Sequence, residues 1–171
     1  MIRTLLGKTP ILRGRVFVAE TAAIIGDVEI GEQSSIWYST VIRGDVMPIR
    51  IGARTSIQDG AVVHVTSGRY GTTIGSDCTV GHSAIVHACV VEDMCLIGMG
   101  SIILDGARIG RGSLVGAGAL VTPGTDIPPG SLVIGSPAKV KRAINERERE
   151  QILFGAAHYV ELSARYLAEG S

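Results

Sequence analysis

Apolar side chains recur with a period of six along most of this chain. An α-helix would give a period of about 3.6 and a half-buried strand a period of about 2. Six residues instead form one short strand and one corner, and three such units close a triangular coil. The pattern therefore predicts a parallel β-helix in which each aliphatic side chain points inward and stacks on its equivalent about 4.8 Å away. The aliphatic positions form successive series: Val18, Ile24, Ile30, Ile36 and Ile42; Ile51, Ile57 and Val63; Ile74, Val80 and Val86; and Val91, Ile97, Ile103, Ile109, Val115, Val121, Ile127 and Val133.

Glycine and small polar residues punctuate this repeat. We expect them at the corners of the coil, where the backbone needs unusual φ and ψ angles. A solenoid of this kind is quasi-one-dimensional, because each coil contacts only its neighbours. Glycine directly follows the aliphatic residue at Gly31, Gly52, Gly75, Gly81, Gly98, Gly110 and Gly116.

The repeat breaks at three points. A nine-residue step over 42–51 indicates an insertion around Met47-Pro48. The polar stretch VTSGRYGTT (65–73) indicates an extruded loop. The step over 86–91 is five residues, a deletion of one. Irregularities in a solenoid tend to lie on the face that binds a ligand or partner.

The pattern changes near the C-terminus. Prolines after position 122 end the β-helix at about Ser136, and residues 138–171 are rich in helix formers with near-helical apolar spacing. Gly155 is expected to bend or divide this segment, giving one or two helices packed against the β-helix. The sequence thus predicts an all-β solenoid over residues 1–137, followed by an α-helical segment over 138–171.

Composition narrows the functional classes. The 171 residues fit one domain with a sizeable core. Lys plus Arg and Asp plus Glu both total 16, so no net charge favours nucleic acid or an anionic membrane. No apolar run approaches the roughly 18 residues of a membrane span, and the N-terminus does not resemble a signal peptide. The irregularly spaced Cys78, Cys89 and Cys95 give no disulfide framework. We expect buried thiols and a cytoplasmic location.

Three of the four histidines fall in the middle of the repeat. His64 and His87 each follow an inward valine, so they hold the same place in the repeat and are expected to stack one coil apart. His82 lies near a corner, one face away, and would reach the same metal ion only from a neighbouring subunit. Three histidine ligands leave a fourth position for water, which is the catalytic arrangement of zinc. His158, in the tail, is expected to be a surface residue.

Three motifs resemble the γ-class carbonic anhydrases and their close homologues. They are RGDVMPIRIG (43–52), SIQDGAVVH (56–64) and VGHSAIVH (80–87). The similarity extends from about Phe17 to the tail. The resemblance to hexapeptide proteins implies a left-handed coil. The family resemblance implies a homotrimer with one zinc ion, or iron or cobalt in its place, at each subunit interface.

The resemblance also implies how the ion is bound. His64 and His87 would bind it from one chain, and His82 would bind it from the next. Gln58 would hydrogen-bond the metal-bound hydroxide or the substrate. Tyr159 resembles a tyrosine that leans over the metal.

Three charged residues have a role implied by the same resemblance. Arg43 and Asp59 would form an ion pair across the interface, and Asp45 would support it. An assembly role without chemistry is an equal alternative for all three.

The implied reaction is hydration of CO2 to bicarbonate. A dipositive ion on three imidazoles lowers the pKa of bound water from about 15.7 to about 7. Turnover also needs a titratable group that removes the proton. The prototype has glutamate at the position of Val46, an acidic loop in place of 65–73 and asparagine in place of Ser56. The sequence therefore predicts a retained metal site, without an evident proton shuttle and with low activity.

Three other functions remain open. A metal-dependent thioesterase or other hydrolase would use the same nucleophile beside a longer apolar groove. A hexapeptide acyltransferase shares the solenoid and an ending like GSPAKV (135–140), but needs one general-base histidine and a groove for coenzyme A. The trimer could instead be a non-enzymatic, metal-stabilised binding module. Function has to be argued from the site, since the fold alone does not decide it.

Overall fold

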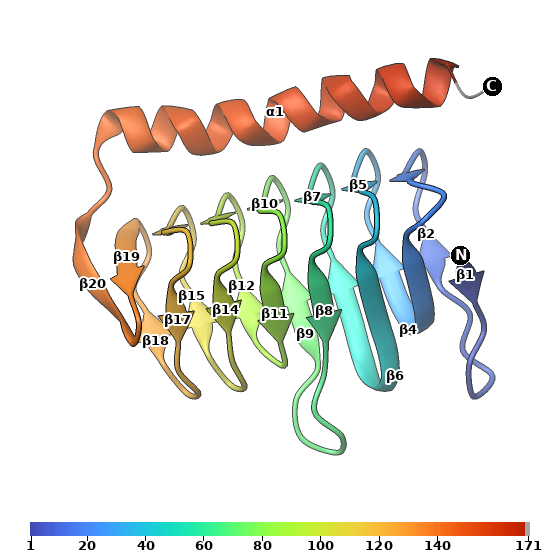
Figure 1. The fold of residues 1–171 in the computed structure, drawn as a ribbon, viewed down its shortest axis with the longest axis horizontal. Coiled ribbons are helices and arrows are strands. Elements are labelled where there is room, and N and C mark those ends of the chain that lie inside the picture. Colours follow the sequence, from blue (N-terminus) through green and yellow to red (C-terminus); the bar gives the residue numbers. More distant parts are fainter. Residues whose placement is uncertain (170–171) are drawn as a thin grey trace.

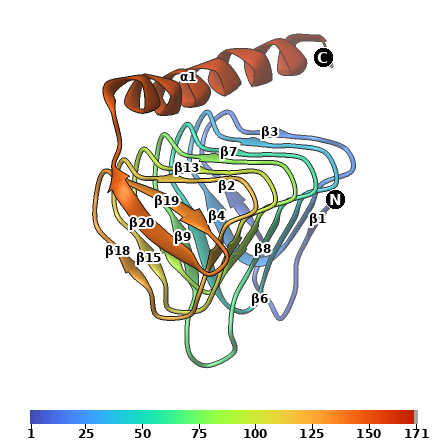
Figure 2. The same cartoon turned by 60° about the vertical axis from the view of Figure 1, so that its left-hand side comes forward.

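A computed structural model describes residues 1–169 as a parallel β-helix with one long α-helix lying along it (Figure 1). The coils are triangular when seen along the solenoid (Figure 2). Every residue of the inward series after Val18 is buried, and Val18 in the first coil is half-buried. The hexapeptide parallel β-helix predicted from the period of six is confirmed.

The strands lie on three faces of the prism. One face, called here the apolar face, holds β8 (Val62–His64), β11 (Ile85–His87), β14 (Ile102–Ile103), β17 (Leu120–Val121) and the first parts of β4 (Ala23–Ile30) and β6 (Val41–Ile51). The polar face holds the second parts of β4 and β6 and then β9 (Thr72–Ile74), β12 (Val90–Val91), β15 (Arg108–Ile109) and β18 (Asp126–Ile127). The helix-covered face holds β3 (Phe17–Val18), β5 (Ser35–Ile36), β7 (Ser56–Ile57), β10 (Thr79–Val80), β13 (Leu96–Ile97), β16 (Leu114–Val115), β19 (Ser131–Gly135) and β20 (Ala138–Ala143). Strands β1 (Ile2–Arg3) and β2 (Ile11–Leu12) pair with β4 at the N-terminal end.

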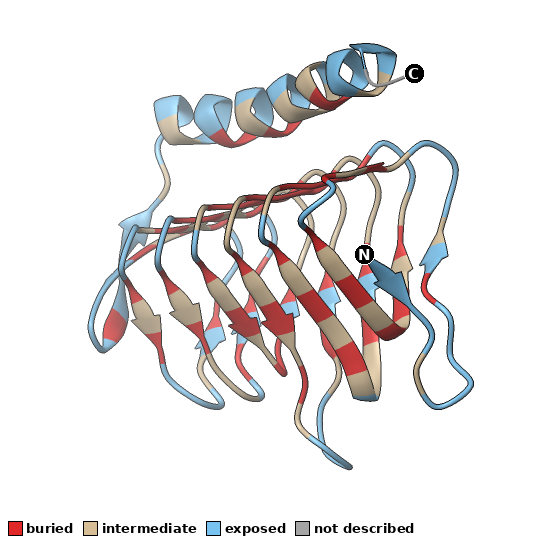
Figure 3. Cartoon of the chain, turned by 45° about the vertical axis from the view of Figure 1, so that its right-hand side comes forward, coloured by how far each residue is buried: buried red, intermediate tan, exposed pale blue. Residues whose placement is uncertain are grey.

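The outward side chains differ between the faces. On the polar face the stacked outward residues are Glu29, Arg50, Thr73, Val90, Arg108 and Asp126. On the apolar face they are Ala23, Val41, Val62, Ile85, Ile102 and Leu120, all half-buried. The third face is covered by helix α1 (Glu146–Glu169), whose buried residues lie on its underside (Figure 3). One face of the prism therefore carries an uncovered apolar column.

The predicted breaks in the repeat are all present. The register between β4 and β6 shifts after Gly26, and a bulge at 45–48 in β6 absorbs the extra residues. Residues 65–71 form a loop at one corner, which projects below the β-helix in Figure 1. The short step over 86–91 keeps the coils in register, because β11 still pairs with β8 and β12 with β9.

The glycines that directly follow an inward aliphatic residue are required for a different reason from the one expected. Gly98, which directly follows an inward aliphatic residue, has an ordinary φ, but an added Cβ would lie 2.5 Å from the backbone nitrogen of Ala117 in the next coil. The positive φ occurs two residues later, for example +64° at Gly100. Close approach of stacked coils therefore explains Gly98, and backbone conformation explains Gly100.

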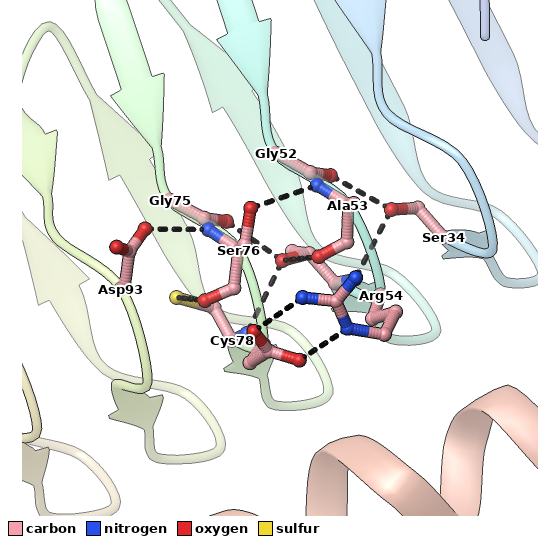
Figure 4. A network of polar contacts seen from close by, with 10 residues as sticks. Ser34, Gly52, Ala53, Arg54, Gly75, Ser76, Cys78 and Asp93 are labelled. Carbon is pink, nitrogen blue, oxygen red and sulfur yellow. Dashed lines mark hydrogen bonds and ion pairs between the residues drawn. The ribbon is translucent and has the colours of Figure 1, made fainter.

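A ladder of small side chains connects successive coils at one corner (Figure 4). Ser34 Oγ donates to the carbonyl of Gly52 (2.8 Å) and accepts the N–H of Thr55 (3.0 Å). Thr55 Oγ1 accepts the N–H of Cys78 (3.1 Å) in the same way. All three cysteines are free and buried, as expected, and burial raises the pKa of Cys89 to about 12. The three cysteines therefore contribute to packing inside the β-helix.

The tail differs from the prediction in two respects. Residues 138–143 form strand β20, which pairs with β19, so the helical part begins only at Glu146. Helix α1 is then continuous through Gly155, whose added Cβ would lie 3.2 Å from Thr79 Oγ1. Gly155 thus allows the helix to approach β10 closely rather than to bend. No helix among residues 1–169 combines the length and apolar character required to cross a membrane.

Two features hold helix α1 in place. Asn145 caps its N-terminus, since Asn145 Oδ1 accepts the N–H of Glu148 (2.9 Å). Its C-terminal half packs through Tyr159 and Tyr166 on the ring of Trp37, with centroids 5.5 and 5.2 Å apart. The helix therefore places Tyr159 above β7 and β10.

Candidate metal centre

His64 and His87 face each other on neighbouring coils. They occupy paired positions at the ends of β8 and β11, as the repeat predicted. Their ring centroids are 5.2 Å apart, and Nδ1 of His64 lies 3.2 Å from Nε2 of His87. Two nitrogens on one tetrahedral zinc ion, each about 2.0–2.1 Å from it, are about 3.3 Å apart. The observed separation suits two ligands of one ion.

The other nitrogen of each ring faces a carboxylate. His64 Nε2 lies 3.0 Å from Asp45 Oδ1, and His87 Nδ1 lies 2.7 Å from Asp105 Oδ1. An ionised carboxylate only accepts hydrogen bonds, so each of these nitrogens carries the proton. With both imidazoles neutral, the two nitrogens that face each other both present lone pairs, which repel unless a cation lies between them. This donor set fits a metal ion, with the carboxylates in the supporting positions usual for metal-bound histidine.

The pKa values of both carboxyl groups support this arrangement. Burial acts to raise the pKa of Asp45, but hydrogen bonds from His64 and Arg43 outweigh it and lower that pKa. Hydrogen bonds from Thr66 and His87 lower the pKa of Asp105 despite its partial burial. Both groups are therefore ionised at neutral pH and act as acceptors.

His82 lies at the opposite corner of the apolar face. It follows β10 in the turn before β11, and Asp59 Oδ2 lies 2.8 Å from its Nδ1. The five residues from His82 to His87 span up to about 16 Å of extended chain. Within residues 1–169 no group of three or more His, Cys, Asp and Glu side chains could hold a metal ion. One chain therefore brings together two of the three predicted ligands and leaves His82 apart.

The predicted charged residues divide between the two corners. Arg43 pairs with Asp45 beside His64, whereas Asp59 pairs with His82. Arg43 and Asp59 are thus not partners within one chain, and their pairing across an interface stays a prediction. Each of the three predicted histidines thus has one ring nitrogen within hydrogen-bond distance of a carboxylate.

Gln58 and Tyr159 lie with His82, not with His64 and His87. All three line a cleft of about 550 Å³ between helix α1 and the helix-covered face, together with apolar residues such as Leu96 and Leu114. Burial, with a contribution from the charge of Asp59, raises the pKa of Tyr159. The Tyr159 hydroxyl is therefore a neutral hydrogen-bond donor. His158, as predicted, is exposed on the helix.

Two residues bear on the predicted lack of a proton shuttle, which stays a prediction. Ser56 is buried and accepts a hydrogen bond from the indole of Trp37 (3.0 Å), so its role is in packing. Glu148 lines the far end of the cleft, but Arg142 and the N–H of Asn145 hold the pKa of Glu148 at about 2. A carboxyl group with this pKa is a poor proton acceptor at neutral pH.

One residue of the site was not predicted. Asp105 lies 18 positions after His87, in the next coil. The signal was present in the repeat, because positions about three hexapeptides apart stack on each other. Counting one coil forward from His87, which is 17 positions at this point of the repeat, leads to Leu104, and Asp105 is the next residue.

Comparisons with known proteins agree with this fold. Residues 88–123 match the family described as bacterial transferase hexapeptide (six repeats). Gamma carbonic anhydrase 2, a mitochondrial protein of Arabidopsis thaliana, is 44% identical over 99% of this chain, which spans 64% of that protein's length. A probable carbonic anhydrase of Methanocaldococcus jannaschii is 54% identical over 86% of this chain and 92% of its own length. The solved structure of a putative acetyltransferase from Bacillus cereus has a TM-score of 0.94 and 45% identity, and covers 96% of this chain and 95% of its own.

Proposed function

Since this chain belongs to the γ-class carbonic anhydrase family of hexapeptide-repeat proteins, we propose that it hydrates CO2 at a metal ion shared between subunits. The observation that carries the proposal is that an aspartate carboxylate lies within hydrogen-bond distance of one ring nitrogen in each of His64, His82 and His87. Acetyl transfer, which the name of the Bacillus cereus structure suggests for that protein, needs a single general-base histidine. It would leave the facing lone pairs of His64 and His87 without a role.

The proposed ion is zinc, with iron or cobalt as alternatives. Neutral imidazole is a good ligand for all of these metals. Three histidines with an open fourth position are the arrangement of catalytic zinc. His64 Nδ1 and His87 Nε2 would hold the ion from one subunit, and the unpaired nitrogen of His82 would bind it from the next.

The apolar face supports a homotrimer. Its outward column runs through six coils, from Ala23 to Leu120, and every residue of the column is partly exposed. Uncovered apolar surfaces of this extent usually mark a protein interface. His64 and His87 lie at one edge of this face and His82 lies at the other. A threefold arrangement that buries the face would bring His82 of one subunit beside His64 and His87 of the next.

The residues of this chain have separate roles in the proposed reaction. When bound, the ion supplies an acidified water as the nucleophile for CO2. Asp45, Asp59 and Asp105 fix the three imidazoles. Gln58 and the neutral hydroxyl of Tyr159 are placed to hydrogen-bond the substrate oxygens. The apolar wall of the cleft suits an uncharged substrate such as CO2.

A buffer experiment tests this function. Because the sequence predicts no proton shuttle, CO2 hydration by the zinc-loaded protein should be slow in a non-transferring buffer. Added imidazole should raise the rate in proportion to its concentration, until another step limits turnover. Stopped-flow measurement with a pH indicator gives this rate. Absence of hydration at every imidazole concentration, with metal bound, would rule out the proposed activity.

One observation favours a second candidate, the hydrolysis of acyl esters or thioesters. The cleft runs along helix α1 from Tyr159 to Glu148, eleven residues or about 16 Å of helix. Its volume of about 550 Å³ lies in the range of pockets for larger ligands and exceeds what CO2 needs. An acyl chain could lie between Leu96 and Leu114, with its carbonyl at His82.

A series of nitrophenyl esters tests this second candidate. If the cleft binds the acyl chain, kcat/KM should rise about fourfold with each added methylene, until the chain fills the cleft. Gln151→Trp, from the lining of the cleft, should remove this rise for long esters and leave the acetate ester unaffected. Glu150→Trp, on the exposed side of the helix, is the matched control. A flat dependence on chain length in the wild-type protein would exclude the hydrolase.

A further inference from the structure

We propose that Asp105 and the extruded loop at 65–71 form a clamp that fixes the tautomer and orientation of His87. The clamp would keep His87 Nε2 directed at His64 Nδ1. The consequence for metal binding rests on the function proposed above. The orientation of the ring does not, since it is a property of the metal-free chain.

Both oxygens of Asp105 are engaged. Oδ1 lies 2.7 Å from His87 Nδ1, and Oδ2 accepts a hydrogen bond from the hydroxyl of Thr66 at the start of the loop. The carbonyl of Asp105 accepts the N–H of Gly124 (2.8 Å), which ties its backbone to the next coil. The carboxylate is therefore held by groups from two coils and its backbone by a third, so it has little freedom to turn away from His87.

Contacts within the loop fix the position of Thr66. The N–H of Thr66 donates to the carbonyl of Tyr70 (3.0 Å), and the N–H of Tyr70 donates back to the carbonyl of Thr66 (3.2 Å). The ring of Tyr70 lies beside Gly106, next to Asp105, where an added Cβ would be 3.5 Å from it. The guanidinium of Arg69 lies over the same ring, 5.1 Å from its centroid.

The end of the loop contacts the other histidine. Thr72 is buried, and its hydroxyl donates a hydrogen bond to the carbonyl of His64. The loop therefore connects to His87 through Thr66 and Asp105, and to the backbone of His64 through Thr72. A loop without any carboxylate of its own thus acts through hydrogen bonds on the ring of His87 and on the backbone of His64.

The clamp decides which nitrogen of His87 can bind a metal ion. A neutral imidazole carries its proton on either nitrogen, and the hydrogen bond of one nitrogen sets the role of the other. With Asp105 accepting from Nδ1, the lone pair stays on Nε2, which faces His64. Supporting carboxylates of this kind change metal affinity by about 10- to 100-fold when removed. Asp105 is therefore a positioning residue.

The test compares Asp105→Ala and Thr66→Val with the control Asp126→Ala, an exposed aspartate on the polar face. Long-range proton–nitrogen NMR of protein labelled with ¹⁵N-histidine reports the tautomer of each ring without metal. We expect His87 to be protonated on Nδ1 in the wild type and control. Asp105→Ala should give a mixture of tautomers. Thr66→Val, which keeps the carboxylate, should give a smaller change in the same direction.

Zinc affinity, measured by competition with a chelator, is the second readout. We expect an increase in Kd of about 10- to 100-fold for Asp105→Ala and no change for Asp126→Ala. An unchanged His87 tautomer in both Asp105→Ala and Thr66→Val would overturn the clamp. If the wild-type protein binds no zinc, the proposed function fails, and the tautomer measurement on metal-free protein still decides the clamp.

Discussion

Replacing His82 with alanine should lower the bound metal from one ion per subunit to background. His82 lies across the apolar face from His64 and His87, so a site within one chain would not require it. If the ion is shared, the loss of His82 leaves only two protein ligands, fewer than the three of a catalytic zinc site. Elemental analysis of the purified protein after dialysis measures the effect.

The matched control is His158→Ala. His158 is exposed on helix α1 and stacks on Phe154, with ring centroids 5.6 Å apart. Its removal should leave the metal content unchanged, which separates ligand loss from the general effect of removing an imidazole. Full zinc retention in the His82→Ala protein would contradict a shared site, even if CO2 hydration were lost.

Introducing a charge in the middle of the apolar face should have the second largest effect. Ile85→Glu should convert the proposed trimer into a monomer that binds no metal, although His64, His82 and His87 are all retained. Ile85 is half-buried in the single chain and lies between Val62 and Ile102 in the outward column. An unpaired charge buried in an interface costs several kcal/mol, enough to prevent assembly.

Val90→Glu provides the control for this variant. Val90 holds the equivalent outward position on the polar face, where its neighbours are Thr73 and Arg108. We expect this protein to remain a trimer with full metal content. Light scattering after size-exclusion chromatography, with metal analysis of each peak, distinguishes the two variants. A monomeric Ile85→Glu protein with full metal content would contradict the proposed interface.

Most of the solenoid could be predicted because each coil repeats the same physical requirement. An aliphatic side chain every six residues fills a narrow prism, and the pattern locates Val63 and Val86 without knowledge of the rest of the chain. The stacking of His64 on His87 follows from that register alone. The separation of His82 from this pair follows in the same way.

The features that were missed depend on contacts between coils rather than on the repeat. Gly98 is required by the backbone of the next coil, and Gly155 by the approach of helix α1 to Thr79. Both looked like sites of unusual backbone conformation in the sequence. Asp105 supports His87 from the coil that follows it, and only a count along the stacked positions would have shown this.

The supporting role of Asp45 for His64 depends on a local irregularity. The bulge at 45–48 shifts the register between β4 and β6 and places the Asp45 carboxylate 3.0 Å from His64 Nε2. The sequence indicated an insertion but not the direction of its side chains. Irregular segments follow no periodic rule, so their side-chain contacts have to come from the structure.

The central claim is that each metal site is completed by two subunits, and complementation between two defective chains tests it most directly. One chain carries His82→Ala, and the other carries His64→Ala together with His87→Ala. Each alone should bind no metal. When the two are co-expressed at equal levels, about three quarters of the trimers are mixed, and each mixed trimer has one complete interface of its three. We predict about a quarter of the wild-type metal content per chain in the co-expressed protein. Mixed trimers that bind no metal would contradict the shared site.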